Sequence, residues 1–383
     1  MDAFPRAGAA IVGAATYGIG EAPGFDSIDL AAHAALRALA AAGLQPKDVD
    51  GLFVGLPQDY LSGLSMSEYF GIRPKVTDNN RTGGSAFMTH VMWASLALAA
   101  GQCDVALICY GSNQRSNAGK LVSSMKQPYF EGGYRPVMPV AAYALAAARH
   151  MHQFGTTREQ LADVAVAARG WAALNPEAFL RDPLSRDQVL ASRMVADPLS
   201  VRDCCLVTDG AAAMVMVRAD RARDLAARPA YVLGAAAATD HMNISAMPDL
   251  TVTAAAESSR RALAQARVDL EEIDNVQLYD AFTINTILFL EDFGFCPKGE
   301  GGRFVQEGAI GPGGRLPVNT NGGGLSCVHP GMYGMFPMVE AATQIAGQAG
   351  ARQVPGAKLA LCHGNGGVLS SQASVILGAV ETV

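Results

Sequence analysis

Apolar and polar positions along the chain follow two spacings in turn, and these predict alternating strands and helices. Short runs rich in consecutive apolar residues occur at Ala9–Thr16, Asp50–Leu56 and Asp104–Gly111, and such runs are typical of strands buried on both faces. Longer segments between them have helical spacing, including Ser27–Gly43 and the almost wholly apolar His90–Gly101. Strands that alternate with helices favour a largely parallel sheet that is covered on both sides.

The same order of elements returns in the second part of the chain. The expected strands and helices there are Arg228–Thr239, Ala254–Val268, Ile273–Ala281, Ile284–Phe295, Met335–Gly350, Lys358–Gly364 and Ser371–Val380. This recurrence indicates an internal duplication of topology with little sequence identity. We predict an N-terminal half at residues 1–225, with an insertion at about 112–200, and a C-terminal half at residues 229–383.

Composition narrows the class of protein. Hydrophobic residues make up 50% of the 383 residues and charged residues 17%, which favours a compact, core-rich enzyme. The formal net charge is -6 and no run of basic residues occurs, which argues against nucleic acid or an anionic membrane as a partner. Seven cysteines without CxxC spacing predict neither a zinc site nor a disulfide framework. We expect a soluble, cytoplasmic protein without a metal.

Chemistry is expected first in the stretch Asn319–Met335. Five glycines in seventeen residues allow tight turns and a close approach of the backbone to a ligand. Within this stretch lie His329, which precedes a proline, and Tyr333, and both side chains can move protons. The stretch therefore predicts one side of an active site.

Several motifs resemble the thiolase superfamily, and in particular its sterol-carrier and lipid-transfer-protein branch. They are YDAFT, FLEDFGFCPKGEGGRF, LPVNTNGGGLS, HPGMYG and ARQVPGAKLALCHGNGG in the C-terminal part, with looser agreement in NNRTGGSAFMTHVMWASLALAAGQCDVALICYG, YALAAARHMHQFGTTREQLADVAV and TDGAAAMVMV. The resemblance covers essentially the whole chain. It implies the five-layered α-β-α-β-α thiolase fold with two duplicated βαβαβαββ halves, a homodimeric core and acyl-CoA substrates.

Two departures from the thiolase pattern change the expected chemistry. The position of the nucleophilic cysteine, at the N-terminus of a buried helix, falls at Gly84 or Ser85. Cys362 matches the second cysteine of thiolases, and we interpret it as buried and inert. Tyr279 and Tyr333 stand in the family's two catalytic motifs, and this pair resembles the steroid side-chain aldolases of the same branch. Those enzymes cleave a β-hydroxyacyl-CoA by retro-aldol chemistry and work with an OB-fold, zinc-ribbon partner protein.

The resemblance implies a role for each site residue. Tyr279 and Tyr333 share the two proton transfers, with either tyrosine able to take either role, and His329 donates a hydrogen bond to the thioester oxygen. No cofactor is implied beyond the coenzyme A of the substrate. The residues expected to bind substrate are Ser85, Asn319, Gly323, His363 and Asn365.

The expected function is therefore a carbon–carbon lyase, an aldolase acting on a β-hydroxyacyl-CoA. A steroid tail, with release of a ketone and a short acyl-CoA such as propionyl-CoA, is preferred over an aromatic or other branched tail. One alternative is an acyltransferase of the acetyl-CoA acetyltransferase type that uses Ser85 or Cys362. Another is a non-catalytic acyl-CoA-binding subunit. The resemblance also implies a homodimer that binds the OB-fold partner in a heterotetramer.

Overall fold

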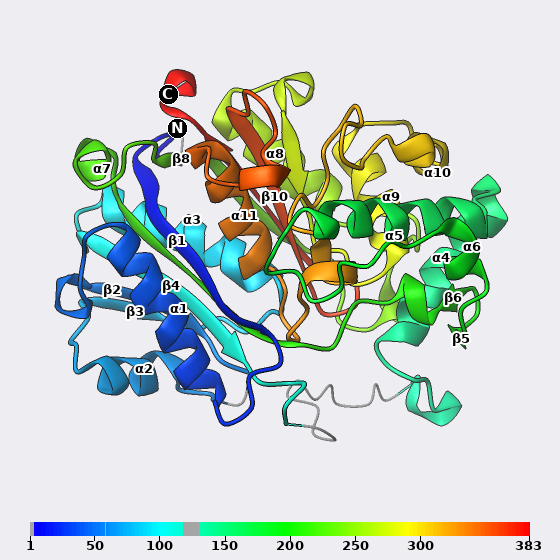
Figure 1. Cartoon of the computed structure of the whole chain (residues 1–383), viewed down its shortest axis with the longest axis horizontal. Helices are drawn as coiled ribbons and strands as arrows, with labels where there is room; N and C mark the ends of the chain where they lie inside the picture. The colour runs from blue at the N-terminus through cyan, green and yellow to red at the C-terminus, as the bar shows by residue number, and fades with distance from the viewer. Residues whose placement is uncertain (1–3, 58, 118–129) are drawn as a thin grey trace.

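A computed structural model describes residues 4–57, 59–117 and 130–383 of the chain. Nine strands form one mixed sheet in the order β3-β2-β4-β7-β1-β8-β11-β10-β9 (Figure 1). The first five strands in this order belong to the N-terminal half and the other four to the C-terminal half. The halves meet where β1 runs antiparallel to β8, at the pairs Ala10–Tyr231 and Ile11–Ala230.

Each half contains strands and helices in the predicted alternation. The N-terminal half comprises β1 (Ala9–Gly20), α1 (Ser27–Ala41), β2 (Gly51–Gly55), α2 (Ser62–Phe70), β3 (Val76–Asp78), α3 (Ser85–Ala99), β4 (Val105–Ser112), β7 (Asp209–Arg218) and α7 (Ala219–Leu225). The C-terminal half comprises β8 (Ala230–Thr239), α8 (Ala255–Ala266), β9 (Asn275–Gln277), α9 (Thr283–Phe293), α10 (Gly301–Phe304), α11 (Met335–Ala346), β10 (Leu359–Gly366) and β11 (Ser371–Gly378).

The predicted duplication is visible in the strand pairing. In the N-terminal half β2 is parallel to β4, which is antiparallel to β7. In the C-terminal half β9 is parallel to β10, which is antiparallel to β11. The counterpart of β3 is reduced to one parallel bridge between Val276 and Val318. The expected strand at Ile273–Ala281 is shorter than predicted, because the Leu278 N–H leaves the ladder and donates to Asn319 Oδ1 at 2.7 Å.

The layers follow from which helix faces are apolar. Helices α3 and α11 lie between the two halves of the sheet and contact strands of both, while α1 covers the outer side of one half and α8 that of the other. Apolar residues surround α3 on all sides, as expected for a helix between two sheets. An Asp26–Asp29 capping box starts α1, and its buried residues form one face. This arrangement is the predicted five-layered thiolase fold.

The insertion in the first half supplies helices that lie over the second half. It comprises α4 (Val140–Phe154), α5 (Arg158–Ala173), α6 (Arg186–Leu190) and the short strands β5 (Met194–Ala196) and β6 (Leu199–Ser200). Helices α4 and α5 contact α9, and they stand beside the C-terminal elements in Figure 1. Residues 118–129 of the expected insertion lie outside the described residues. The domain limits at residues 225 and 229 stay a prediction.

Candidate active site

Tyr279, His329 and Tyr333 meet between the loop after β9 and the segment that leads into α11. The Tyr279 hydroxyl lies 3.1 Å from His329 Nε2, and it accepts a hydrogen bond from the Tyr333 backbone N–H at 3.3 Å. The same hydroxyl can donate to the Gly331 carbonyl at 3.3 Å. The Tyr279 ring stands edge-on to both His329 and Tyr333, with centroids 5.5 and 5.7 Å apart. The structure thus brings together the three residues expected to be catalytic.

Tyr333 is fully buried, and its hydroxyl has a different partner. It donates to Asn321 Oδ1 at 3.0 Å. The Tyr333 ring stacks on the His329 ring, with centroids 6.1 Å apart, and on the Phe336 ring, with centroids 5.8 Å apart. Asn321 Oδ1 also accepts from the Gly323 N–H at 2.8 Å, which fixes the orientation of the amide. Tyr333 therefore has to be the donor in its bond to Asn321.

At Gly84, one of the two positions expected for the thiolase nucleophile, the Tyr279 ring fills the space of a side chain. A Cβ atom added to Gly84 would lie 2.0 Å from Tyr279 Cε2, so no side chain can occupy this position while the ring stays in place. Ser85 does not face the tyrosines. Its hydroxyl lies 3.0 Å from the Thr82 hydroxyl and donates to the Ser371 hydroxyl at 3.0 Å. Both partners are hydroxyls, which cannot activate serine as a nucleophile.

Cys362, which the sequence matches to the second cysteine of thiolases, lies on β10. Two residues further along this strand, a Cβ atom added to Gly364 would lie 2.7 Å from the Gly84 carbonyl oxygen, so this part of β10 packs against the start of α3. Cys362 is fully buried on β10, and burial raises the pKa of its thiol well above the ordinary range. A buried thiol with a raised pKa is inert, as predicted for this residue.

Asn319 and Gly323 shape the turn that carries the site. Asn319 adopts a left-handed backbone conformation (φ 52°), and its side chain holds Leu278, next to Tyr279. Gly323 begins a five-residue π-helix, Gly323–Cys327 (η7), and a Cβ there would lie 2.0 Å from Asp280 Oδ2. The Asp280 carboxylate in turn accepts a hydrogen bond from the Gly324 N–H at 2.6 Å. These contacts assign Asn319 and Gly323 to the support of the site.

His363 and Asn365 lie on the opposite face of β10 from Gly364. His363 contacts the Ser374 hydroxyl and the Gln372 amide oxygen, at 3.0 and 2.9 Å. Asn365 Nδ2 donates to the Tyr143 hydroxyl at 2.8 Å. The structure does not bring either side chain to the catalytic tyrosines, because side chains alternate between the two faces of a strand. Asn365 reaches the neighbourhood of the site through Tyr143, and the expected contact of both residues with substrate stays a prediction.

Burial sets the charge state of the site. It lowers the pKa of His329 to about 4, which keeps the imidazole neutral at pH 7. Burial also raises the pKa values of Tyr279 and Tyr333 well above 10. The pKa of Asp280 rises to about 7 for the same reason, although the Gly324 N–H opposes the shift. At pH 7 His329 and both tyrosines are therefore neutral, and each tyrosine hydroxyl holds a proton, whereas Asp280 is close to half ionised.

Three further residues belong to this neighbourhood and were not predicted. Asn321 holds the Tyr333 hydroxyl, Asp280 anchors the π-helix, and Tyr143 of α4 stacks on Phe282 with centroids 4.3 Å apart. Asp280 and Asn321 were visible inside the two recognised motifs, without a cue to their partners. Tyr143 begins the more loosely matching motif YALAAARHMHQFGTTREQLADVAV, on an alanine-rich helix, and that motif gave no cue that the residue lies near the site.

The described residues contain neither a candidate metal site nor a helix that could span a membrane. In residues 4–57, 59–117 and 130–383, no group of three or more His, Cys, Asp or Glu side chains is placed to share a metal ion. Over the same ranges, no helix combines the length and apolar character needed to cross a membrane.

The chain belongs to the thiolase family. The family model described as the thiolase N-terminal domain matches residues 9–220, and the thiolase C-terminal domain-like model matches residues 236–379. Together with the layered fold, these matches define a thiolase-fold protein.

Similar proteins carry names from two classes of enzyme. The chain is 34% identical to an acetyl-CoA acetyltransferase of Methanothermobacter thermautotrophicus, over 94% of this chain and 96% of that protein. It is 33% identical to the 17-hydroxy-3-oxo-4-pregnene-20-carboxyl-CoA lyase of Mycobacterium tuberculosis, over 97% and 99%. Among solved structures, the "Ltp2-ChsH2(DUF35) aldolase" aligns with a TM-score of 0.87 and 32% identity, over 98% of both chains. The distinction between acyltransferase and lyase therefore has to come from the site.

Proposed function

We propose that this protein is a thiolase-family aldolase that cleaves the Cα–Cβ bond of a β-hydroxyacyl-CoA by a retro-aldol reaction. One observation carries the proposal: the Tyr279 ring fills the space beside Gly84 that a nucleophilic side chain would need. Acyl transfer through an enzyme thioester requires a thiol at that point. A retro-aldol cleavage requires a base, an acid and a donor to the thioester oxygen, and this site offers all three.

The reaction balances with the residues at hand. Tyr279, as its phenolate, accepts the proton of the β-hydroxyl, and the freed electron pair forms the ketone. The Cα–Cβ bond breaks, and its electrons move into the thioester as an enolate. Tyr333 then gives its proton to Cα, which yields the shortened acyl-CoA. His329, with a proton on Nε2, donates to the thioester oxygen where negative charge develops.

The assignment of the two tyrosines follows from their hydrogen bonds. Beside the Tyr279 hydroxyl stands the Tyr333 backbone N–H, which can donate to a phenolate while His329 donates to the thioester oxygen. Tyr333 instead faces the acceptor oxygen of Asn321, which favours the protonated hydroxyl. Tyr279 is thus suited to be the base and Tyr333 the acid.

The class of substrate comes from the relatives. The Mycobacterium tuberculosis lyase is named for a steroid acyl-CoA with a hydroxyl on the carbon β to the thioester. A steroid tail is accordingly our preferred case, with a 17-ketone and propionyl-CoA as products. The name of the Ltp2-ChsH2 aldolase supports a partner protein, and we propose a homodimer joined to an OB-fold/zinc-ribbon subunit.

The acyltransferase alternative is favoured by the acetyltransferase relative, and both can be tested together. A thiolase cleaves its acyl-CoA substrate only with free coenzyme A, whereas an aldolase needs none. We expect the purified protein, with its partner if one co-purifies, to release propionyl-CoA from 17-hydroxy-3-oxo-4-pregnene-20-carboxyl-CoA without added coenzyme A. Loss of the Tyr279 hydroxyl should slow this by about 10²–10⁴-fold in Tyr279→Phe.

The matched control is Tyr231→Phe, at a buried tyrosine of β8 that is remote in the fold from the site. An absolute requirement for free coenzyme A, or full cleavage by Tyr279→Phe, would reject the aldolase assignment. Binding of the substrate without any cleavage would favour a non-catalytic acyl-CoA-binding subunit.

A further inference from the structure

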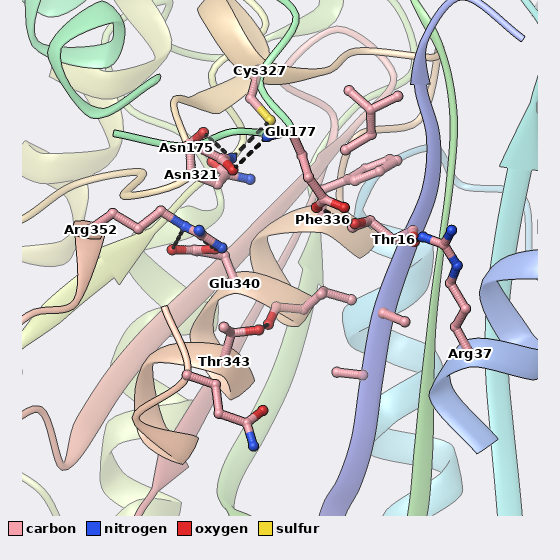
Figure 2. A pocket seen from close by; sticks show the side chains of 15 residues that line it. Thr16, Arg37, Asn175, Glu177, Asn321, Cys327, Phe336, Glu340, Thr343 and Arg352 are labelled. Carbon is pink, nitrogen blue, oxygen red and sulfur yellow. Dashed lines mark hydrogen bonds and ion pairs between the residues drawn. The ribbon is translucent and has the colours of Figure 1, made fainter. Parts of the chain in front are cut away.

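A polar pocket of about 260 Å³ leads from the molecular surface to Asn321 and Phe336, two residues that contact Tyr333 (Figure 2). Its rim carries three exposed side chains, Arg37, Glu177 and Gln348. Its inner end is formed by buried residues, namely Asn175, Asn321, Cys327, Phe336 and Glu340. The pocket lies between β1 and α11, on the other side of Tyr333 from His329.

Two contacts connect this pocket to the catalytic tyrosine. Phe336 lines the pocket, and its ring lies parallel to the Tyr333 ring at 5.8 Å, with 7° between the planes. Asn321 also lines the pocket, and its side-chain oxygen accepts a hydrogen bond from the Tyr333 hydroxyl. The backbone carbonyl of Asn321 is held by Asn175 Nδ2 at 2.9 Å. The Tyr333 hydroxyl is therefore one hydrogen bond away from the inner end of the pocket.

After one turnover of the proposed reaction, neither tyrosine is in the protonation state in which it began. Each turnover adds a proton to Tyr279 and removes one from Tyr333, so before the next cycle Tyr279 has to lose a proton to solvent and Tyr333 has to regain one. The described hydrogen bonds of the two hydroxyls have no residue side chain in common: Tyr279 contacts His329, Gly331 and the Tyr333 backbone, and Tyr333 contacts Asn321. A second connection to bulk solvent would restore the proton.

We propose that the pocket is the water route through which Tyr333 regains its proton, and that Asn321 is the positioning residue that holds the Tyr333 hydroxyl at its inner end. This inference rests on the proposed aldolase function. The volume accommodates several waters, since one water needs only about 10–15 Å³ of such space. A water at the inner end gives a proton to the phenolate and receives one from the next water, so the charge passes to bulk solvent.

The charged side chains of the pocket suit such a route. Glu177, at the exposed rim, accepts a hydrogen bond from the Thr16 hydroxyl at 2.7 Å. Glu340 is held by Arg352 in a buried ion pair, which keeps the wall polar (Figure 2). An apolar acyl tail would have to displace solvent from these charges, so we do not assign the pocket to the substrate.

The experiment compares the first turnover with later ones. Thr343→Phe narrows the pocket from α11, and Ala15→Leu narrows it from the opposite wall on β1. If one of these variants fails to fold, the other still tests the route. Thr343→Val is the control, because it removes the hydroxyl without adding bulk. Rapid mixing with 17-hydroxy-3-oxo-4-pregnene-20-carboxyl-CoA measures both rates in the full chain, with its partner if one co-purifies.

In the two variants with a narrowed pocket, the rate of the first turnover should stay within about twofold of the unmodified protein, because Tyr333 begins protonated. The steady-state rate should fall by roughly tenfold or more. A first turnover slowed in the same proportion, or an unchanged steady state, would overturn the inference. Absence of cleavage in the unmodified protein would instead contradict the aldolase function itself.

Asn321 has its own test. Asn321→Leu removes the acceptor of the Tyr333 hydroxyl and should slow the first turnover by about tenfold or more with KM unchanged. Asn321→Asp keeps an oxygen for both hydrogen bonds and should restore part of that rate. Equal loss in both variants, or a change confined to KM, would reject the positioning role.

Discussion

At the scale of single residues, the chemistry depends on the exchange of a thiol for a phenol. Gly84 has no side chain, and Tyr279 reaches from the other half of the fold into the space this leaves. The sequence predicted the nucleophile position at Gly84 or Ser85, and the Tyr279 ring occupies the side-chain space of Gly84. The orientation of Ser85, His363 and Asn365 was not predictable, because it depends on which face of α3 or β10 meets the site.

The close contact of Gly84 and Tyr279 predicts the effect of one added methyl group. We expect Gly84→Ala to lower the free energy of unfolding by about 1–3 kcal/mol through overpacking, and to abolish most cleavage by displacing the Tyr279 ring. Gly133→Ala is the matched control, because a Cβ at that exposed position meets nothing within 4 Å. Denaturant unfolding and a cleavage assay give both quantities. Near-normal values for Gly84→Ala would disprove the close packing.

The raised pKa of Tyr279 predicts how the rate depends on pH. Burial moves this pKa well above 10, so the active phenolate is a small fraction that grows about tenfold per pH unit below that pKa. We expect kcat/KM to rise with this slope from about pH 6 to 9. His329 adds no step in that range, because its pKa is about 4. A flat profile would mean that another group accepts the proton.

At the scale of elements, the site rests on irregular segments that periodicity does not predict. The strand before Tyr279 ends early, and the π-helix Gly323–Cys327 replaces an expected loop. Both depend on side-chain contacts over long sequence separations, those of Asn319 with Leu278 and of Asp280 with Gly324. The regular helices and strands agreed better with prediction, because their apolar spacing is a local property.

Asp280 predicts a pH dependence of stability. Its pKa is raised by burial from 3.8 to about 7 in the folded state, so the folded protein binds an extra proton between these values. The protonated carboxyl therefore contributes fully to the free energy of unfolding below about pH 4. This contribution is lost as the pH rises to about 7, by roughly 4 kcal/mol at most. Unfolding of Asp280→Asn should lack this loss. The exposed control Asp187→Asn should keep it, and identical pH curves for all three proteins would contradict the assignment.

At the scale of the whole molecule, the duplicated halves place a helix of each at the centre of the fold. The N-terminus of α3 and the segment before α11 meet there, so each half supplies one side of the site. The fold class and the three catalytic candidates could be predicted from sequence motifs. The pocket behind Tyr333 could not, because its walls combine β1, α1, α11 and the loop after α5.

The central claim is that cleavage proceeds without a covalent acyl-enzyme. The most direct measurement is intact-protein mass spectrometry on samples quenched during turnover of 17-hydroxy-3-oxo-4-pregnene-20-carboxyl-CoA. We predict an unmodified protein mass at every time point, together with equal amounts of ketone and propionyl-CoA. A protein species heavier by an acyl group, formed and consumed at the rate of turnover, would contradict the account.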